Sequence, residues 1–165
     1  SMARVKRILP ALSLLSACAG CDQATKAIAR THLQESGAVE FLHGLFRLQY
    51  AENQGAFLGL GTNVPEELRY GIFILLVGMI LAGMLLYLLF SKRLAAGQAA
   101  ALSLVLGGGL GNLIDRMLHD GRVIDFMNLG IGSVRTGIFN VADVAILAGI
   151  LLLLALSAGK RHEHT

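Results

Sequence analysis

Four long apolar runs dominate the chain, at residues 8–27, 70–90, 96–114 and 139–158. The run at 70–90 has 21 nearly uninterrupted apolar residues, enough for a helix to cross about 30 Å of hydrocarbon at 1.5 Å per residue. The run at 96–114 is rich in Gly and Ala, as expected where helices approach closely in lipid. The pattern predicts a mainly α membrane protein with four transmembrane helices.

The first run has two interpretations. It follows Arg4, Lys6 and Arg7 and contains the sequence Leu15-Ser16-Ala17-Cys18, so it resembles a secretory signal with a lipobox. Asp22-Gln23-Ala24-Thr25-Lys26, however, continues the helix without a break, and three more apolar runs follow. We therefore expect a retained first span, with cleavage as the alternative. Cys18 and Cys21 have a Cys-x-x-Cys spacing but lie in an apolar run, which favours helix packing over redox or zinc chemistry.

Two polar segments, 28–69 and 115–138, separate the runs on one side of the membrane. Residues 39–50 are rich in β-formers around Gly44 and predict a hairpin or small sheet on the membrane surface. Residues 53–65 then lead to a short turn at 66–69, and we expect a β-rich cradle with a short helix or lid. Five apolar side chains are expected to enter the headgroup layer: Phe41, Leu45, Phe46, Phe57 and Leu58.

Composition supports one membrane domain over residues 1–165. The chain is 55% hydrophobic with a mean hydropathy of +0.64, too apolar for a soluble domain, and its net charge of +3 is too small to indicate nucleic-acid binding. The side that holds both termini has seven Lys and Arg residues and one acidic residue. The opposite side has seven Lys and Arg residues and ten acidic residues. The positive-inside rule therefore predicts cytoplasmic termini, and places 28–69 and 115–138 outside.

The stretch from Gly107 to Asp143 carries the candidate chemistry. An ionisable side chain at the bilayer centre costs roughly 2.5–3.5 kcal/mol on insertion scales, so such residues indicate function by default. Asp125 has apolar neighbours, and Asp143 lies near the start of the fourth run. Two nearby carboxylates that share a proton can activate water and protonate an amide carbonyl, with no metal or covalent intermediate. The alternative for Asp143 is a capping box with Asn140 as N-cap. Both roles can hold at once.

Several further polar residues keep two interpretations. Asn112, Asp115 and Arg116 share a helical face, and Arg116 either clamps a substrate carbonyl or pairs with Asp115 or Asp120. Asp115 is also the rival of Asp125 as partner of Asp143, although the apolar neighbours favour Asp125. Asp22 and Lys26 form an i, i+4 pair in which a structural role is favoured, and Asn53 alone is more typical of a turn. The histidines lack metal-ligand spacing, no Ser–Lys pair is evident, and the glycines from Gly107 to Gly111 favour helix packing over phosphate binding.

Five motifs lie in order between residues 22 and 143 and together resemble the signal peptidase II family of bacterial lipoprotein signal peptidases. They are Asp22-Gln23-Ala24-Thr25-Lys26, Asn53-Gln54-Gly55-Ala56-Phe57, Gly108-Gly109-Leu110-Gly111-Asn112-Leu113-Ile114-Asp115-Arg116, Val123-Ile124-Asp125-Phe126 and Phe139-Asn140-Val141-Ala142-Asp143. One such motif is weak, but five in this order are specific. The chain departs from many relatives at Phe57, where they have a second small residue.

The resemblance implies an aspartic endopeptidase of the bacterial inner membrane that acts near the periplasmic face. It would cut diacylglyceryl-modified prolipoproteins just before the lipidated Cys. No cofactor or metal is expected, and nothing in the sequence demands more than a monomer. Asp125 and Asp143 match the catalytic pair. Asn53, Asn112, Arg116 and Asn140 match residues that hold the peptide, or the cyclic-peptide inhibitor globomycin. Asp22, Lys26 and Asp115 match supporting positions.

Two other classes remain as alternatives. A small transporter or channel would use intramembrane acids as a proton relay, and it predicts acids near the bilayer midplane with cytoplasmic access. The acids of this chain instead cluster on one side. A structural subunit or anchor would cleave nothing, which an assay of the purified protein can test.

Overall fold

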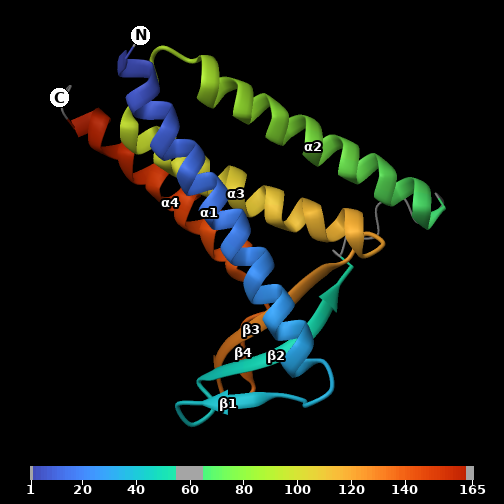
Figure 1. Ribbon diagram of the computed structural model, residues 1–165. Coiled ribbons are helices and arrows are strands. Elements are labelled where there is room, and N and C mark those ends of the chain that lie inside the picture. Colours follow the sequence, from blue (N-terminus) through green and yellow to red (C-terminus); the bar gives the residue numbers. More distant parts are fainter. Residues whose placement is uncertain (1, 55–64, 163–165) are drawn as a thin grey trace.

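The part of the chain that the structure describes forms four long helices with a small sheet at one end (Figure 1). A computed structural model describes residues 2–54 and 65–162. The elements in chain order are α1 (Met2–Leu33), β1 (Val39–Phe41), β2 (Phe46–Asn53), α2 (Glu66–Phe90), α3 (Ala96–Leu118), β3 (Val123–Ile131), β4 (Val134–Arg135) and α4 (Val141–His162).

Three of the helices are long and apolar enough to cross a membrane: Tyr70–Phe90 in α2, Ala96–Leu118 in α3 and Val141–Gly159 in α4. Helix α1, at 32 residues, is the longest of the helices described, but its small polar residues and its charged pair Asp22 and Lys26 lower its hydropathy. The protein is therefore a mainly helical membrane protein, and the predicted first span at 8–27 stays a prediction.

Several boundaries differ from the predicted ones. Residues 66–69, expected as a separate turn, form the first turn of α2, and α3 continues to Leu118 instead of ending at 114. Helix α4 begins at Val141, two residues later than expected, because Asn140 caps it. The predicted lid, with Phe57 and Leu58, lies mainly outside the described residues. Phe41 and Leu45 are exposed and Phe46 is half-buried, and their contact with headgroups stays a prediction.

Glycines in α3 allow two helices to approach its backbone. A Cβ at Gly107 would lie 2.7 Å from Cys18 Cβ of α1, and one at Gly108 would overlap the Ala142 carbonyl oxygen of α4. These contacts show that the glycine run packs helices, as predicted. Cys18 takes part in this packing, whereas Cys21 is exposed, so the packing role expected of both cysteines holds only for Cys18.

The sheet is antiparallel, with strand order β1-β2-β3-β4. The predicted hairpin is present as β1 and β2, with Gly44 at φ +84° in the turn. Strands β3 and β4 were not predicted, since residues 115–138 read as an irregular polar segment. Strand β3 forms by pairing with β2, which lies far away in sequence, and this pairing sets Ala51 opposite Asp125 and Asn53 opposite Val123. The sheet thereby brings the end of β2 to the point where α3, β3 and α4 meet.

Candidate active site

Asp125 is a buried carboxylate near the start of β3, with an exposed fraction of 2%. Its two oxygens accept hydrogen bonds from different amides. Asn53 Nδ2 donates to Oδ2 at 3.1 Å, and Asn140 Nδ2 donates to Oδ1 at 2.7 Å. These donors come from the end of β2 and from the residue before α4, so three separate parts of the chain fix the position of this carboxylate.

Asp143 lies in the first turn of α4 and forms the predicted capping box. Its backbone N–H donates to Asn140 Oδ1 at 2.9 Å, and its Oδ2 accepts from the Asn140 backbone N–H at 3.1 Å. The other carboxylate oxygen, Oδ1, accepts from Asn112 Nδ2 of α3 at 2.9 Å. The cap therefore uses one oxygen of Asp143, while the second faces the polar side chains of α3.

Asn140 connects the two carboxylates. It is fully buried, at 0% exposure. Its Nδ2 donates to Asp125, to Asn112 Oδ1 at 3.0 Å and to the Ile124 carbonyl oxygen at 3.3 Å, while its backbone donates to Asp143. A single residue thus holds Asp125 of the sheet and Asp143 of α4 in one hydrogen-bonded group.

Asp125 and Asp143 have different electrostatic surroundings. The pKa of the Asp125 carboxyl is raised to about 6, chiefly by burial and also by the nearby charge of Asp143, whereas the hydrogen bonds from Asn53 and Asn140 lower it. A carboxyl with this pKa holds a proton in part of the molecules near neutral pH. Asp143 sits at the positive end of the α4 dipole, which favours a negative charge there.

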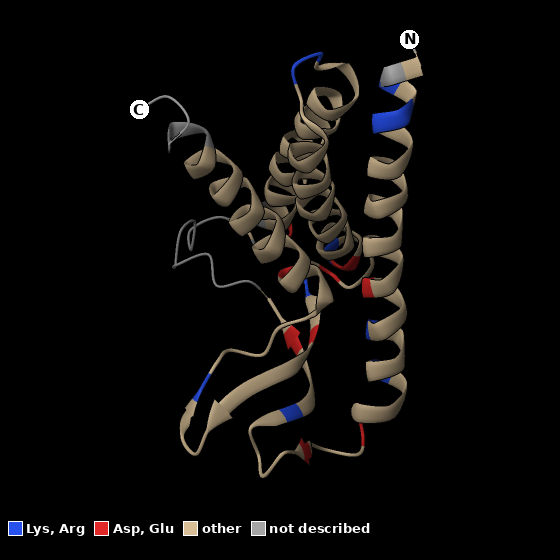
Figure 2. Cartoon of the chain, turned by 90° about the vertical axis from the view of Figure 1, so that its left-hand side faces the viewer, with Lys and Arg blue, Asp and Glu red and all other residues tan. Residues whose placement is uncertain are grey.

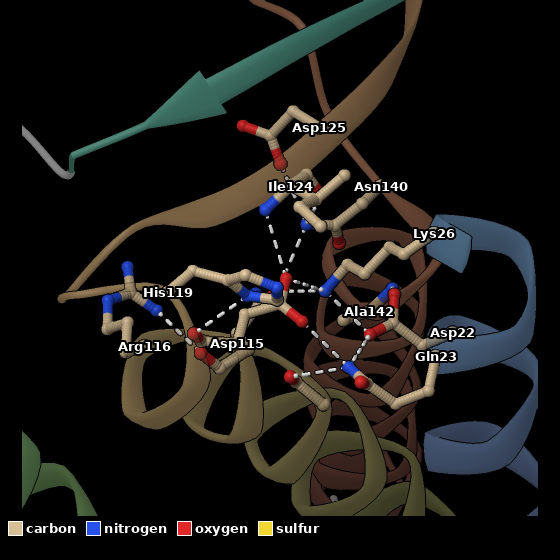
Figure 3. Close-up of polar contacts among 12 residues, drawn as sticks. Asp22, Gln23, Lys26, Asp115, Arg116, His119, Ile124, Asp125, Asn140 and Ala142 are labelled. Carbon is tan, nitrogen blue, oxygen red and sulfur yellow. Dashed lines mark hydrogen bonds and ion pairs between the residues drawn. The ribbon is translucent and has the colours of Figure 1, made fainter. Parts of the chain in front are cut away.

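Below Asp125 in Figure 3 lies a buried ion group of Lys26, Asp22 and Asp115, each at most 1% exposed. Lys26 Nζ lies 2.6 Å from Asp22 Oδ2 and 2.8 Å from Asp115 Oδ2, and it also donates to Asn112 Oδ1 at 3.0 Å. The structural pair predicted for Asp22 and Lys26 is therefore present, and Asp115 joins it.

The ion group extends to the backbone beside each carboxylate of the pair. Asp115 Oδ2 accepts from the Ile124 N–H at 3.0 Å, and Asp22 Oδ1 accepts from the Ala142 N–H at 2.8 Å. Ile124 precedes Asp125, and Ala142 precedes Asp143. Asp115 Oδ1 accepts from Gln23 Nε2 at 2.9 Å, and Oδ2 forms the ion pair with Lys26, so the described contacts of Asp115 place it in the ion group.

Within residues 2–54 and 65–162, Arg116 forms no ion pair with Asp115 or Asp120, the acids expected as its local partners. Its Nη1 donates to the Asn112 carbonyl oxygen at 3.2 Å, and its guanidinium carbon lies 5.0 Å from the centre of the Phe73 ring of α2. It also lines a cleft of about 830 Å³ between the start of α2 and the α3–β3 connection. This position suits a side chain that meets a ligand in the cleft.

Sequence reasoning placed the acids and amides but missed two contacts. The sequence indicates no role for Gln23 beyond its place in the first motif. Its side-chain amide nevertheless donates hydrogen bonds to Asp115 and to the Gly111 carbonyl oxygen. Its position beside Asp22 on a helix near an apolar–polar boundary was the available signal. Phe73 had no polar signal at all. Among residues 2–54 and 65–162, no group of three or more His, Cys, Asp or Glu is arranged to hold a metal ion.

Comparison with known proteins gives a consistent result. Residues 14–158 match a family model described as signal peptidase (SPase) II. The chain is 36% identical over 143 residues to a lipoprotein signal peptidase of Syntrophus aciditrophicus, covering 86% of this chain and 88% of the relative. It is 37% identical over 156 residues to one of Moorella thermoacetica, covering 93% of this chain and 97% of the relative.

Two solved structures, each described as a bacterial membrane enzyme obtained by the in meso method, share the fold. The first, at 2.3 Å resolution, aligns with a TM-score of 0.78 at 24% identity and covers 94% of this chain and 92% of that one. The second, at 1.9 Å resolution, aligns with a TM-score of 0.75 at 26% identity and covers 89% of this chain and 91% of that one.

Proposed function

We propose that this chain, which belongs to the signal peptidase II family, cleaves its substrates with Asp125 and Asp143 as the catalytic pair. As a member of that family it is an aspartic protease of a membrane, and it removes signal peptides from prolipoproteins. The observation that carries the residue assignment is the Asn140 bridge, which joins a buried carboxylate on β3 to a helix-capping carboxylate on α4.

The two carboxylates take different roles in the proposed reaction. Asp143, favoured as an anion by the α4 dipole, takes a proton from the attacking water. Asp125, whose pKa is raised to about 6, donates its proton to the carbonyl oxygen of the scissile amide. When the tetrahedral intermediate collapses, the proton taken by Asp143 passes to the departing amine, and the proton on the intermediate returns to Asp125.

Four polar residues complete the proposed site. Asn112 and Asn140 orient the carboxylates through the bonds described above. Arg116 lines the cleft of about 830 Å³, where we place a part of the substrate peptide away from the scissile bond, since neither Asp125 nor Asp143 lines this cleft. Asn53 approaches Asp125 from the end of β2. The same cleft is the proposed site for globomycin. Asp22, Lys26 and Asp115 support the pair from below without touching substrate.

We propose further that α1 is a fourth span and that both termini are cytoplasmic in the bacterial inner membrane. Helix α1 packs along α3, and its charged pair points into the bundle, where lipid does not reach it. In Figure 2 the acids gather toward the sheet, whereas Lys and Arg lie both at the end of the helices that holds the N-terminus and at the sheet end. The end that carries basic residues without acids supports the proposed orientation. The one-sided distribution of the acids also argues against a transmembrane proton relay.

A cleavage assay tests the proposal. Purified protein is incubated with a diacylglyceryl-modified prolipoprotein and with the same protein unmodified. We expect cleavage of the modified substrate only, immediately before the lipidated Cys, and inhibition by globomycin. A lipidated substrate is fixed in the bilayer, so its scissile bond meets the pair by geometry. Equal cleavage of both substrates would contradict the proposed dependence on the lipid.

A further inference from the structure

A second pocket lies at the other end of the helices, between the start of α1 and the start of α3. It has a volume of about 170 Å³. Its floor is apolar and includes Pro10 and Leu14 of α1 and Ala99 and Ala100 of α3, and Lys6 and Arg7 line it as well. Lys6 precedes Lys26 by 20 residues on α1, so about 30 Å of helix separates Lys6 from the Lys26 ion group.

The positive charge at this pocket has no carboxylate partner among residues 2–54 and 65–162. Lys6 is exposed, and it belongs to none of the four ion pairs found there. Arg7 uses both terminal nitrogens to donate to carbonyl oxygens, of Leu94 at 3.0 Å and Ser91 at 2.6 Å. Its Nε is buried and has no hydrogen-bond acceptor in the same part of the chain.

The small side chains of α3 explain why the pocket exists. Ala99 and Ala100 leave the space beside Pro10 and Leu14 unfilled, whereas longer apolar side chains would close it. A cationic rim above an apolar floor at a helix end matches a molecule with an anionic head and a hydrocarbon tail. A free phosphate would satisfy the rim but leave the floor unfilled.

From this geometry we infer that the pocket binds one anionic phospholipid, with the headgroup phosphate at Lys6 and the first acyl carbons over Ala100. Basic pockets between transmembrane helices on the cytoplasmic side are suited to acidic headgroups, and each cation near such a surface is worth about 1 kcal/mol. The bound lipid bridges α1 and α3 beside Arg7, which itself bonds the α2–α3 connection. Occupancy therefore stabilises the helix ends without touching the catalytic pair.

Native mass spectrometry of the full chain in detergent tests this inference, with phosphatidylglycerol, phosphatidylcholine and inorganic phosphate as separate probes. We expect the protein to retain one phosphatidylglycerol molecule tightly, to bind phosphatidylcholine more weakly and to retain no inorganic phosphate. Lys6→Ala should weaken phosphatidylglycerol binding about fivefold. Ala100→Leu, which keeps the charges and fills the floor, should reduce it as well. Lys92→Ala, which removes an exposed charge outside the pocket, is the matched control.

Each outcome decides the question, and cleavage activity of every variant confirms that it is folded. Weaker phosphatidylglycerol binding in Lys6→Ala and in Ala100→Leu, with unchanged binding in Lys92→Ala, supports the proposed pocket. Equal weakening in Lys6→Ala and Lys92→Ala would show that only general surface charge attracts the lipid. Equal retention of phosphatidylcholine, or unchanged binding in Ala100→Leu, would overturn the inference.

Discussion

Asp125 shows how single residues set the chemistry. Burial raises its pKa to about 6, and two amide donors hold that value down. The carboxyl is therefore protonated below about pH 6 and progressively ionised above it. If it is the general acid, kcat should fall as the pH rises through this pKa.

Asn53→Ala should move the alkaline side of the pH–kcat profile upward. The Asn53 amide donates to the ionised form of Asp125, so its removal leaves that form less stable and raises the pKa. The loss of one hydrogen bond to a charged group corresponds to a shift of about one pH unit. A pH profile of kcat for the variant and the wild type measures it. An unchanged or downward-shifted profile would show that Asp125 does not carry the transferred proton.

Lys26 is a second residue with a clear expected effect, on stability. It is 1% exposed and forms ion pairs with two buried acids, Asp22 and Asp115. Lys26→Met should lower the free energy of unfolding by about 3–5 kcal/mol, because it leaves buried carboxylates unpaired. Denaturation in detergent, compared with Lys92→Met at an exposed site, provides the measurement. Similar stability of the two variants would mean that the ion group contributes nothing to the folded state.

At the scale of the elements, the site depends on close approach of α3 and α4. Gly108 faces the Ala142 carbonyl oxygen, one residue from Asp143, and Gly111 faces the Asp22 carboxylate. The site also depends on strand pairing, because β2 and β3 place Asn53 beside Asp125. The catalytic pair is thus assembled where a helix pair and a strand pair meet.

Gly108→Leu should separate α3 from α4, displace Asp143 and abolish most of the activity. No low-strain position exists for the new side chain, because it would meet backbone atoms of α4. Gly78→Leu in α2 is the matched control, since a Cβ there meets nothing within 4 Å. Cleavage assays and melting temperatures of both variants measure the effect. Full activity of Gly108→Leu would show that this approach does not position Asp143.

The elements also show what the sequence could predict. Long apolar runs and the 39–50 hairpin have local signals, and so does the cap formed by Asn140 and Asp143. Strand β3 has none of comparable strength, since it forms by pairing with a strand about 75 residues earlier. The double role of Asn140, as cap and as donor to Asp125, depends on that pairing too. Spacing along one helix cannot reveal it.

At the scale of the whole molecule, charge is distributed between two ends. The acids lie toward the sheet, whereas Lys and Arg lie at both ends, so the end of the helices that holds the N-terminus is the basic one (Figure 2). The proposed orientation places the catalytic pair near the outer surface, at the depth where a lipid-anchored substrate presents its cleavage site. The basic end would then face the cytoplasm and its anionic lipids.

Cysteine labelling of intact cells should distinguish the two ends. In a background where Cys18 and Cys21 are replaced by Ala, Leu42→Cys in the β1–β2 turn should react with a membrane-impermeant maleimide added outside. Lys92→Cys in the α2–α3 connection should react only after the cells are opened. The reverse pattern would contradict the proposed orientation, and labelling of both from outside would contradict the proposed spans.

The assignment of the catalytic pair is tested most directly by cleavage of a diacylglyceryl-modified prolipoprotein by Asp125→Asn, Asp143→Asn and Asp115→Asn, each checked for folding. We expect turnover to fall at least about a hundredfold in the first two, because each removes a proton-transfer group. Asp115→Asn, which weakens only the supporting ion group, should keep measurable turnover. An active Asp125→Asn together with an inactive but folded Asp115→Asn would contradict the account and transfer the catalytic role to Asp115.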